Sequence, residues 1–317
     1  MEYRTLGNSG PRVSVIGLGC NNFGRQKTLT GTQEGTNAVI DAAIEAGITF
    51  FDTADIYGSQ RGLSETLMGN ALGKRRNDIV LATKFGMEME GVNGPDGGAR
   101  GSRAYIRRAV QSSLARLQTD WIDLYQLHQP DPLTPIEQTI AALDELVTEG
   151  TVRYIGHSNL SGWQLAHAEH LARAGGYTSF TSAQNEYSLL ERGVENEVLP
   201  AANHFGLGFL PYFPLFNGLL SGKFTREGGP ADSRIMAIRP HVHENAPWDT
   251  LEAYAAFCKQ HDVSMLDATF AWMLAQPGLT SVIAGATRPE QVAQNADAAT
   301  AWRPTPADLD EISSIFS

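Results

Sequence analysis

The amino-acid sequence predicts an α/β protein whose residues 1–317 form one (β/α)8 TIM barrel. Three observations predict this fold. Eight short segments are almost wholly apolar, segments with helical spacing separate them, and polar residues capable of catalysis stand where three of them end. Strands that are apolar on both faces are typical of a parallel sheet covered by helices. Eight strand-helix units favour a closed barrel, which reaches about 250 residues or more as a single domain.

The expected strands follow one another at regular intervals along the chain. They cover residues 13–19, 49–53, 79–85, 122–128, 154–159, 180–184, 207–212 and 281–285. Between them, residues 37–46 and 103–118 each place apolar side chains on one helical stripe. Each strand therefore has a helical segment that can carry the chain back to the start of the next strand.

Some segments are additions to the eight units. Residues 1–11 contain a turn-forming run from Gly7 to Gly10, and we expect a β-hairpin there that plugs the bottom of the barrel. Residues 305–316 begin with Thr-Pro, which predicts an extra C-terminal helix. Residues 86–101 are rich in glycine and residues 217–248 form a still longer connection. Both are expected to be loops at the catalytic end, and long loops of this kind are often lids or carry extra helices.

Composition limits the classes of partner. The formal net charge is -11 and the longest basic cluster is Lys74 to Arg76, so we expect no nucleic-acid partner and no acidic membrane surface. Cys20 and Cys258 lie far apart and indicate neither a disulfide framework nor a metal site. The sequence lacks a leader-like N-terminus and an apolar run of the ~20 residues that a membrane span needs. These features predict a cytoplasmic protein, and the oligomeric state stays open.

Four polar residues near the strand ends indicate one chemistry. Asp52, Lys84 and His128 end apolar runs, and Tyr57 follows Asp52 by five residues. Tyrosine has a pKa of about 10, which a nearby ammonium lowers, and Asp52 can keep Lys84 charged. His128 can hydrogen-bond the same reacting oxygen. Such a set delivers a proton to a carbonyl oxygen while a nicotinamide delivers hydride to the carbon.

Other interpretations of single residues remain open at this point. An Asp after a strand is often a turn cap, and a strand-end Lys is usually solvated. Lys84 could instead be the amine of a Schiff-base aldolase. The glycines at positions 17, 19 and 24 have the wrong spacing for a Rossmann fingerprint. Two histidine pairs, at 167/170 and 241/243, lack the cysteines or carboxylates of a metal site, so no metal is expected.

Five motifs carry a resemblance to a known family. They are FDTADIYG at 51–58, ATKFG at 82–86, DLYQLHQP at 123–130, GHSN at 156–159 and GATRPEQ at 285–291. In this order they resemble the aldo-keto reductase family over essentially the whole chain. The resemblance implies NAD(P)H-dependent carbonyl reduction, with Tyr57 as proton donor, Lys84 and Asp52 tuning it and His128 orienting the carbonyl.

The chain is also similar to the potassium-channel β subunits of the same superfamily, which hold coenzyme with little turnover. That branch has Asn at the position of His128. The resemblance therefore leaves a cofactor-binding regulatory subunit as the alternative, and the histidine favours a working reductase.

The resemblance further implies a set of coenzyme-binding residues. Those expected near the nicotinamide are Asp52, Ser158, Asn159, Gln184 and Tyr212. Those expected along the pyrophosphate are Phe213, Pro214, Leu215, Gly218, Lys223 and Arg234. Those expected around the adenosine and its 2′-phosphate are Gly285, Thr287, Arg288, Gln291 and Asn295, with Gly19, Cys20 and Asn21 at the end of the first barrel strand.

Two departures from the family pattern matter. Phe213 stands where members often carry Ser, and Gln291 stands where many carry Arg. Arg288 lies three residues earlier and can reach the same phosphate, so we expect NADPH to be preferred over NADH by a modest margin. The substrate is a small carbonyl compound of unknown identity. Candidates for the pocket mouth are Asn22, Phe23, Ile56, Phe85, Met87, Phe216 and Trp248.

Overall fold

Eight parallel strands form the barrel in the computed structural model, which describes residues 1–231 and 233–317 and leaves the side chain of Arg234 undescribed. The strands are β3 (Ile16–Gly19), β4 (Phe50–Asp52), β5 (Val80–Phe85), β6 (Ile122–Leu127), β7 (Val152–Ser158), β8 (Ser182–Glu186), β9 (Gly208–Tyr212) and β10 (Val282–Gly285). They pair in sequence order, and β10 pairs with β3. A parallel bridge between Phe209 and Leu279 joins the remaining edges, so the predicted (β/α)8 barrel is confirmed.

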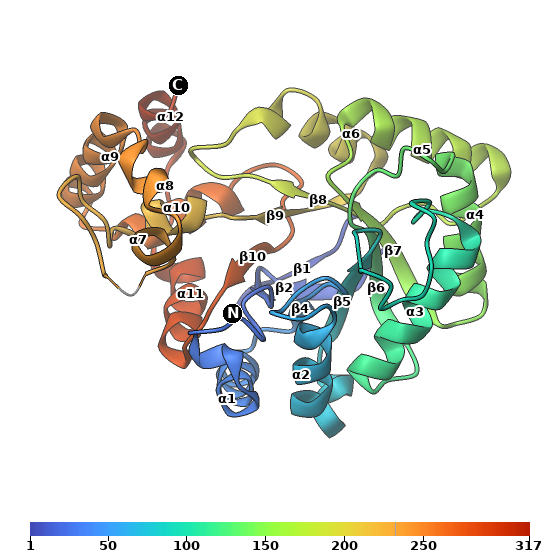
Figure 1. Ribbon diagram of the computed structural model, residues 1–317. Coiled ribbons are helices and arrows are strands. Elements are labelled where there is room, and N and C mark those ends of the chain that lie inside the picture. The colour runs from blue at the N-terminus through green and yellow to red at the C-terminus, as the bar shows by residue number, and fades with distance from the viewer. Residues whose placement is uncertain (232) are drawn as a thin grey trace.

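Helices surround this sheet (Figure 1). The barrel helices are α1 (Gln33–Glu45), α2 (Leu63–Leu72), α3 (Arg103–Leu117), α4 (Ile136–Thr148), α5 (Gly162–Gly175), α6 (Val198–Phe205), α10 (Met265–Leu274) and α11 (Pro289–Ala301). Additional helices are α7 (Arg234–Ile238), α8 (Pro240–Glu244), α9 (Trp248–Gln260) and α12 (Pro306–Ile315), and short 3-10 helices include η4 (Phe216–Ser221). Among the described residues, no helix is long and apolar enough to cross a membrane.

Side-chain caps fix where several helices begin. Thr32 accepts a hydrogen bond from the Gly35 amide, which starts α1 four residues before the expected residue 37. Ser161 and Gln164 form a capping box on α5. Thr305 and Asp308 do the same on α12, so the predicted C-terminal helix and its cap are confirmed.

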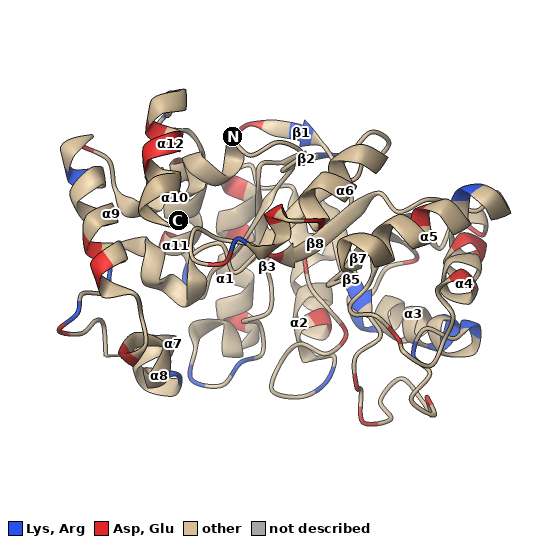
Figure 2. Cartoon of the chain, turned by 90° about the horizontal axis from the view of Figure 1, so that it is seen from above, with Lys and Arg blue, Asp and Glu red and all other residues tan. Residues whose placement is uncertain are grey.

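The N-terminal hairpin closes one end of the barrel. Strands β1 (Tyr3–Thr5) and β2 (Arg12–Ser14) pair antiparallel. Leu6 and Val13, both fully buried, lie in one cluster with inward residues of the strands, namely Phe50, Ala82, Leu124, Leu210 and Ile283. Figure 2 shows the hairpin at the end of the molecule opposite to α7 and α8. The expected plug is therefore present.

The single strand expected over residues 13–19 is wrong. It is divided between β2 of the hairpin and β3 of the barrel. The Ser14 hydroxyl donates to the Ile16 carbonyl at 2.6 Å, and the Ser14 amide donates to the Thr49 hydroxyl at 3.0 Å. Side-chain hydrogen bonds of this kind compete with the strand ladder and turn the chain from one sheet to the other.

The two long connections lie where they were expected. Residues 86–101, between β5 and α3, contain no helix or strand. Residues 217–248 contain most of η4, then α7 and α8, and reach the start of α9. Both follow the carboxyl ends of strands, so they border the end of the barrel that the hairpin leaves open.

Candidate active site

Asp52, Lys84 and His128 meet at the carboxyl ends of three neighbouring strands. Asp52 ends β4, Lys84 lies in β5 and His128 follows β6. The Lys84 ammonium donates to Asp52 Oδ2 at 2.6 Å and to the Thr53 carbonyl at 2.8 Å. Lys84 is fully buried and Asp52 is 3% exposed, so the ion pair is shielded from water. A buried ammonium needs such a partner to stay charged.

Two amides complete the environment of Asp52. Gln126 and Gln184 each donate to Asp52 Oδ1 at 3.1 Å. Sequence reasoning missed Gln126 because it lies inside an apolar run. Its signal is the alternation of β6, in which Leu124, Gln126 and then His128 share the inward face. Gln184 was expected at the nicotinamide carboxamide, and its amide nitrogen also donates to Asp52 in the structure.

Tyr57 lies in the loop after β4, beside both Lys84 and His128. The Lys84 nitrogen lies 5.2 Å from the centroid of the Tyr57 ring. The His128 ring meets the same ring edge-on, with centroids 5.7 Å apart. Burial raises the pKa of the Tyr57 phenol and outweighs the lowering by the charge and hydrogen bond of Lys84. The expected net lowering by Lys84 is therefore corrected, and the phenol keeps its proton at neutral pH.

The other two groups are held in defined charge states. Burial lowers the pKa of Lys84, but the charges of Asp52 and Tyr57 and hydrogen bonds to both raise it above its usual value. Burial and then the positive charge of Lys84 hold the pKa of His128 well below its usual value. At neutral pH the site thus combines a neutral phenol, an ammonium and a neutral imidazole. The Nδ1 atom of His128 is buried and has no partner among the described residues.

Three of the residues expected near the nicotinamide are joined in a chain of hydrogen bonds. The Tyr212 hydroxyl donates to Asn159 Oδ1 at 2.9 Å. The Asn159 amide donates to the His128 carbonyl at 2.9 Å and to the Ser158 hydroxyl at 3.0 Å. Asn159 has a φ of 62°, a left-handed conformation that Asn tolerates better than most residues. These contacts place the amide of Asn159 at the open end of the barrel.

The segment expected along the pyrophosphate has an unusual backbone. Phe213 and Gly218 have φ values of 54° and 112°. Pro214 is buried, whereas Lys223 is exposed at the end of the segment. The amides of Phe216 and Gly218 donate to the carbonyls of Phe213 and Leu215 at 2.9 and 2.8 Å, so the segment folds into tight turns. The side chain of Arg234 lies outside the described residues.

At the expected adenosine end, Gly19 and Gly285 pair across β3 and β10. A Cβ at Gly285 would lie 3.1 Å from the Asn22 amide, so the glycine lets the Asn22 side chain pack closely against this strand end. Cys20 is fully buried, and its thiol donates to the Leu18 carbonyl at 3.4 Å. Its side chain thus points away from the open end.

Thr287, Gln291 and Arg288 surround the start of α11. The Thr287 amide and hydroxyl donate to the Gln291 amide oxygen at 2.8 and 3.1 Å. This contact ties Thr287 to the first turn of α11, and it leaves the Gln291 nitrogen as the group of that side chain that can face an anion. Arg288 is exposed, and Asn295 is buried one turn further along the helix. The structure therefore brings the expected residues to one strand end.

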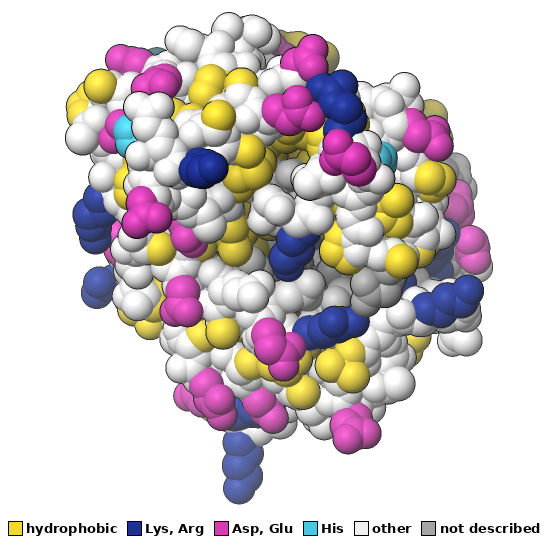
Figure 3. Space-filling view, turned by 90° about the vertical axis from the view of Figure 1, so that its left-hand side faces the viewer, with side chains coloured by type: hydrophobic (Ala, Val, Ile, Leu, Met, Phe, Trp, Pro, Cys, Tyr) yellow, Lys and Arg dark blue, Asp and Glu magenta, His cyan; other side chains and the backbone are white. Residues whose placement is uncertain are grey.

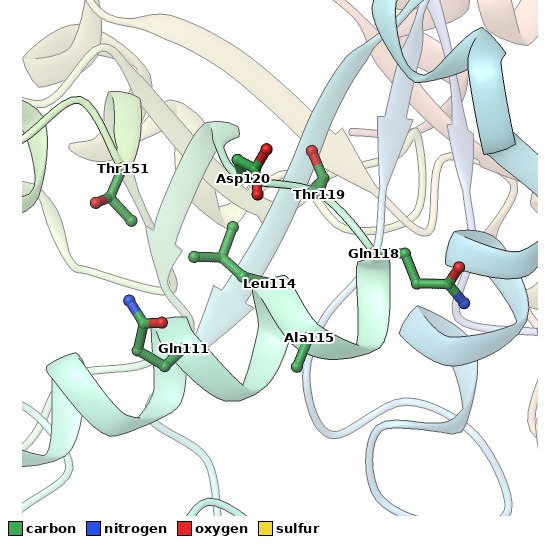
Figure 4. Close-up of a pocket in the computed structure, with 7 residues that line it drawn as sticks. All are labelled: Gln111, Leu114, Ala115, Gln118, Thr119, Asp120 and Thr151. Carbon is green, nitrogen blue, oxygen red and sulfur yellow. The ribbon is translucent and has the colours of Figure 1, made fainter.

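Two candidates for the pocket mouth are wrong. Phe23 and Phe85 are fully buried in the main apolar core and offer no surface to a substrate. Figure 4 shows a hollow lined by residues of α3, by the segment before β6 and by Thr151, which immediately precedes β7. It lies at the amino ends of β6 and β7, opposite to Lys84 and His128, and is not part of this site.

Figure 3 shows one face of the molecule, which includes α9 and α11 and on which acidic and basic side chains are interspersed. Several of the basic groups are paired, as Arg226 is with Glu252 at 2.9 Å. Exposed pairs of this kind contribute little to stability, and they leave no field of one sign.

Comparison with known proteins places these residues in a family context. A model of the aldo/keto reductase family matches residues 15–316. The chain is 40% identical to the uncharacterized oxidoreductase YrpG of Bacillus subtilis, covering 92% of this chain and 89% of that protein. It is 36% identical to the probable aldo-keto reductase 1 of Glycine max, covering 92% and 82%. It is 34% identical to a probable voltage-gated potassium channel subunit beta of Oryza sativa, covering 93% and 90%.

Proposed function

Because this chain belongs to the aldo/keto reductase family and is an oxidoreductase, we propose that it reduces aldehyde or ketone carbonyls with NADPH, and that Tyr57 donates the proton. The observation that carries the proposal is the environment of Tyr57, a neutral phenol between an ammonium and a neutral imidazole. A phenol so placed gives its proton to a developing alkoxide, and the ammonium stabilises the phenolate that remains.

Each side chain of the proposed mechanism has a separate role. Asp52 holds the Lys84 ammonium, and Lys84 offsets part of the cost of ionising Tyr57. The neutral imidazole of His128 meets the Tyr57 ring edge-on and can hydrogen-bond the same substrate oxygen. A bound nicotinamide would supply hydride to the carbonyl carbon. Asn159 and Ser158 would hold its carboxamide, since they face the open end beside His128.

The preference for NADPH is part of the proposal. Arg288 and the nitrogen of Gln291 stand at the start of α11, where helix amides also favour a phosphate. Gly285 is exposed at the end of β10, so a coenzyme can pass this strand end. Because a single arginine serves the site, the preference over NADH is modest.

The two alternatives are weaker. An aldolase needs a neutral lysine, and the pKa of Lys84 is raised by its ion pair, so its amine is a poor nucleophile. A regulatory subunit remains the second candidate because of the similarity to the channel subunit of Oryza sativa. His128 favours turnover over this role.

Replacement of Tyr57 by Phe tests the proposal. We expect Tyr57→Phe to lower turnover of a non-activated aldehyde by roughly 10²- to 10⁴-fold, the usual contribution of general acid catalysis. Coenzyme affinity should be nearly unchanged, because the phenol acts on the substrate oxygen. NADPH oxidation over a panel of aldehydes, ketones and quinones, beside a fluorescence titration of NADPH, measures both. Wild-type turnover in Tyr57→Phe would show that another group donates the proton.

A further inference from the structure

A buried network behind Tyr57 has no part in the proton transfer described above. Asp55 and Glu65 are both fully buried. The Asn93 amide donates to Asp55 Oδ2 at 2.9 Å, and Arg116 donates to Asn93 Oδ1 at 3.1 Å. Arg116 also binds Glu65 at 2.6 Å, and Thr83 donates to the other Glu65 oxygen at 2.6 Å. The network thus continues from Asp55 to Thr83 without a break.

The two ends of this network adjoin the catalytic residues. Asp55 lies two positions before Tyr57, and its amide donates to the Lys84 carbonyl at 3.1 Å. Thr83 immediately precedes Lys84 in β5. A shift at either end therefore moves the phenol relative to the ammonium.

Asn93 brings the loop over residues 86–101 into this network. It is 3% exposed although it lies in a segment without helix or strand. Polar loop side chains are usually solvated, so a buried loop amide with two partners indicates an anchor. A second contact joins the same two segments, since Arg61 binds Glu90 at 3.0 Å, but Glu90 is 69% exposed there. Such an exposed pair contributes little.

The buried contact differs because Asp55 has few other partners. Its Oδ1 atom has no hydrogen-bond partner among the described residues. Burial, and then the charge of Glu65, raise the pKa of the Asp55 carboxyl well above its usual range. Loss of the Asn93 amide would remove the one side-chain donor that this buried carboxyl has among the described residues, which is costly. The environment of Asp55 is therefore more stable when the loop is docked.

We propose that Asp55 and Asn93 are positioning residues, whose hydrogen bond docks the loop over residues 86–101 against the segment that carries Tyr57 and fixes the phenol beside Lys84. This inference rests on the proposed reductase function. A displacement of about 1 Å in a catalytic group can lower the rate about 100-fold, so a docked loop is a condition for turnover.

Four variants test the inference. Asp55→Ala and Asn93→Ala remove one partner each, Asp55→Asn keeps an acceptor for Asn93, and Glu90→Gln removes the exposed contact between the same segments. The assays are turnover of para-nitrobenzaldehyde with NADPH, NADPH affinity by fluorescence, and hydrogen exchange of residues 86–101.

We expect both alanine variants to lower kcat about 10- to 100-fold, with faster exchange in the loop and NADPH affinity changed less than about threefold. Asp55→Asn should keep kcat within about threefold of wild type, because its amide oxygen still accepts from Asn93. Glu90→Gln should resemble wild type in all three measurements.

Two results would overturn the inference. One is an Asn93→Ala variant that matches Glu90→Gln in kcat, and the other is a loss of kcat without faster exchange in the loop. If Asp55→Ala does not fold, Asn93→Ala decides alone, because its side chain lies in the loop. A wild-type protein that reduces no aldehyde refutes the reductase function, whereas unchanged exchange in Asn93→Ala refutes the docking itself.

Discussion

Removal of the Lys84 ammonium should separate stability from activity. In Lys84→Met, the Asp52 carboxylate keeps its bonds from Gln126 and Gln184 but loses its only ion-pair partner among the described residues. An unpaired charge left in a buried site costs about 3–5 kcal/mol. The free energy of unfolding should fall by that amount, and kcat should fall roughly 10²- to 10⁴-fold.

A second substitution then removes the unpaired charge. In Lys84→Met/Asp52→Asn, the Asn oxygen still accepts from both glutamines, so about 2–3 kcal/mol of the lost stability should return. Turnover should not return, because no ammonium stabilises the Tyr57 phenolate. Urea unfolding followed by circular dichroism gives the stabilities, and steady-state aldehyde reduction gives kcat. A double variant no more stable than Lys84→Met would refute the account of Asp52 as a buried anion held by Lys84.

Three further perturbations address other parts of the molecule. Arg288→Ala should lower the preference for NADPH over NADH by about tenfold, since one charge-assisted contact is worth about 1.5–3 kcal/mol. Fluorescence titrations of both coenzymes measure this preference, and an unchanged ratio of the two affinities in the variant would show that the phosphate binds elsewhere. Burial lowers the pKa of His157 to about 3, so below pH 6.5 the unfolded chain binds a proton that the folded protein does not. The free energy of unfolding therefore falls as the pH falls, and in His157→Gln this fall between pH 7 and pH 5 should be smaller by about 2 kcal/mol. Urea unfolding at the two pH values measures it, and an unchanged fall in the variant would contradict the prediction. Leu6→Ala should cost about 2–5 kcal/mol by leaving a cavity in the barrel floor while kcat stays at the wild-type value, and a large loss of kcat would show that the floor shapes the site.

Much of the barrel and of the catalytic centre could be predicted from the sequence, because both are recorded in local patterns. Asp52, Lys84 and His128 end apolar runs, and strand ends of a barrel meet at one rim. Contacts between segments that are distant in the sequence could not be predicted from such local patterns. Nothing in the loop sequence distinguishes Asn93 from its exposed neighbours, and its role appears only when Asp55 lies opposite.

The net shift of the Tyr57 pKa and the hydrogen-bond partners of Gln291 could not be predicted from the sequence either. The ammonium of Lys84 acts on Tyr57 in the expected direction, but burial acts against it, and the depth of burial depends on the folded chain. Gln291 was expected to face a phosphate, and the oxygen of its amide accepts from the Thr287 backbone amide, which leaves its nitrogen for that role. Such competition between partners depends on distances that only the fold defines.

Leu6 and Val13 of the N-terminal hairpin close one end of the barrel, and this limits how molecules reach its interior. This end of the barrel is filled with apolar side chains, so molecules reach the catalytic residues from the opposite end. Under the proposed function, the ligand that binds deeper must bind first and leave last.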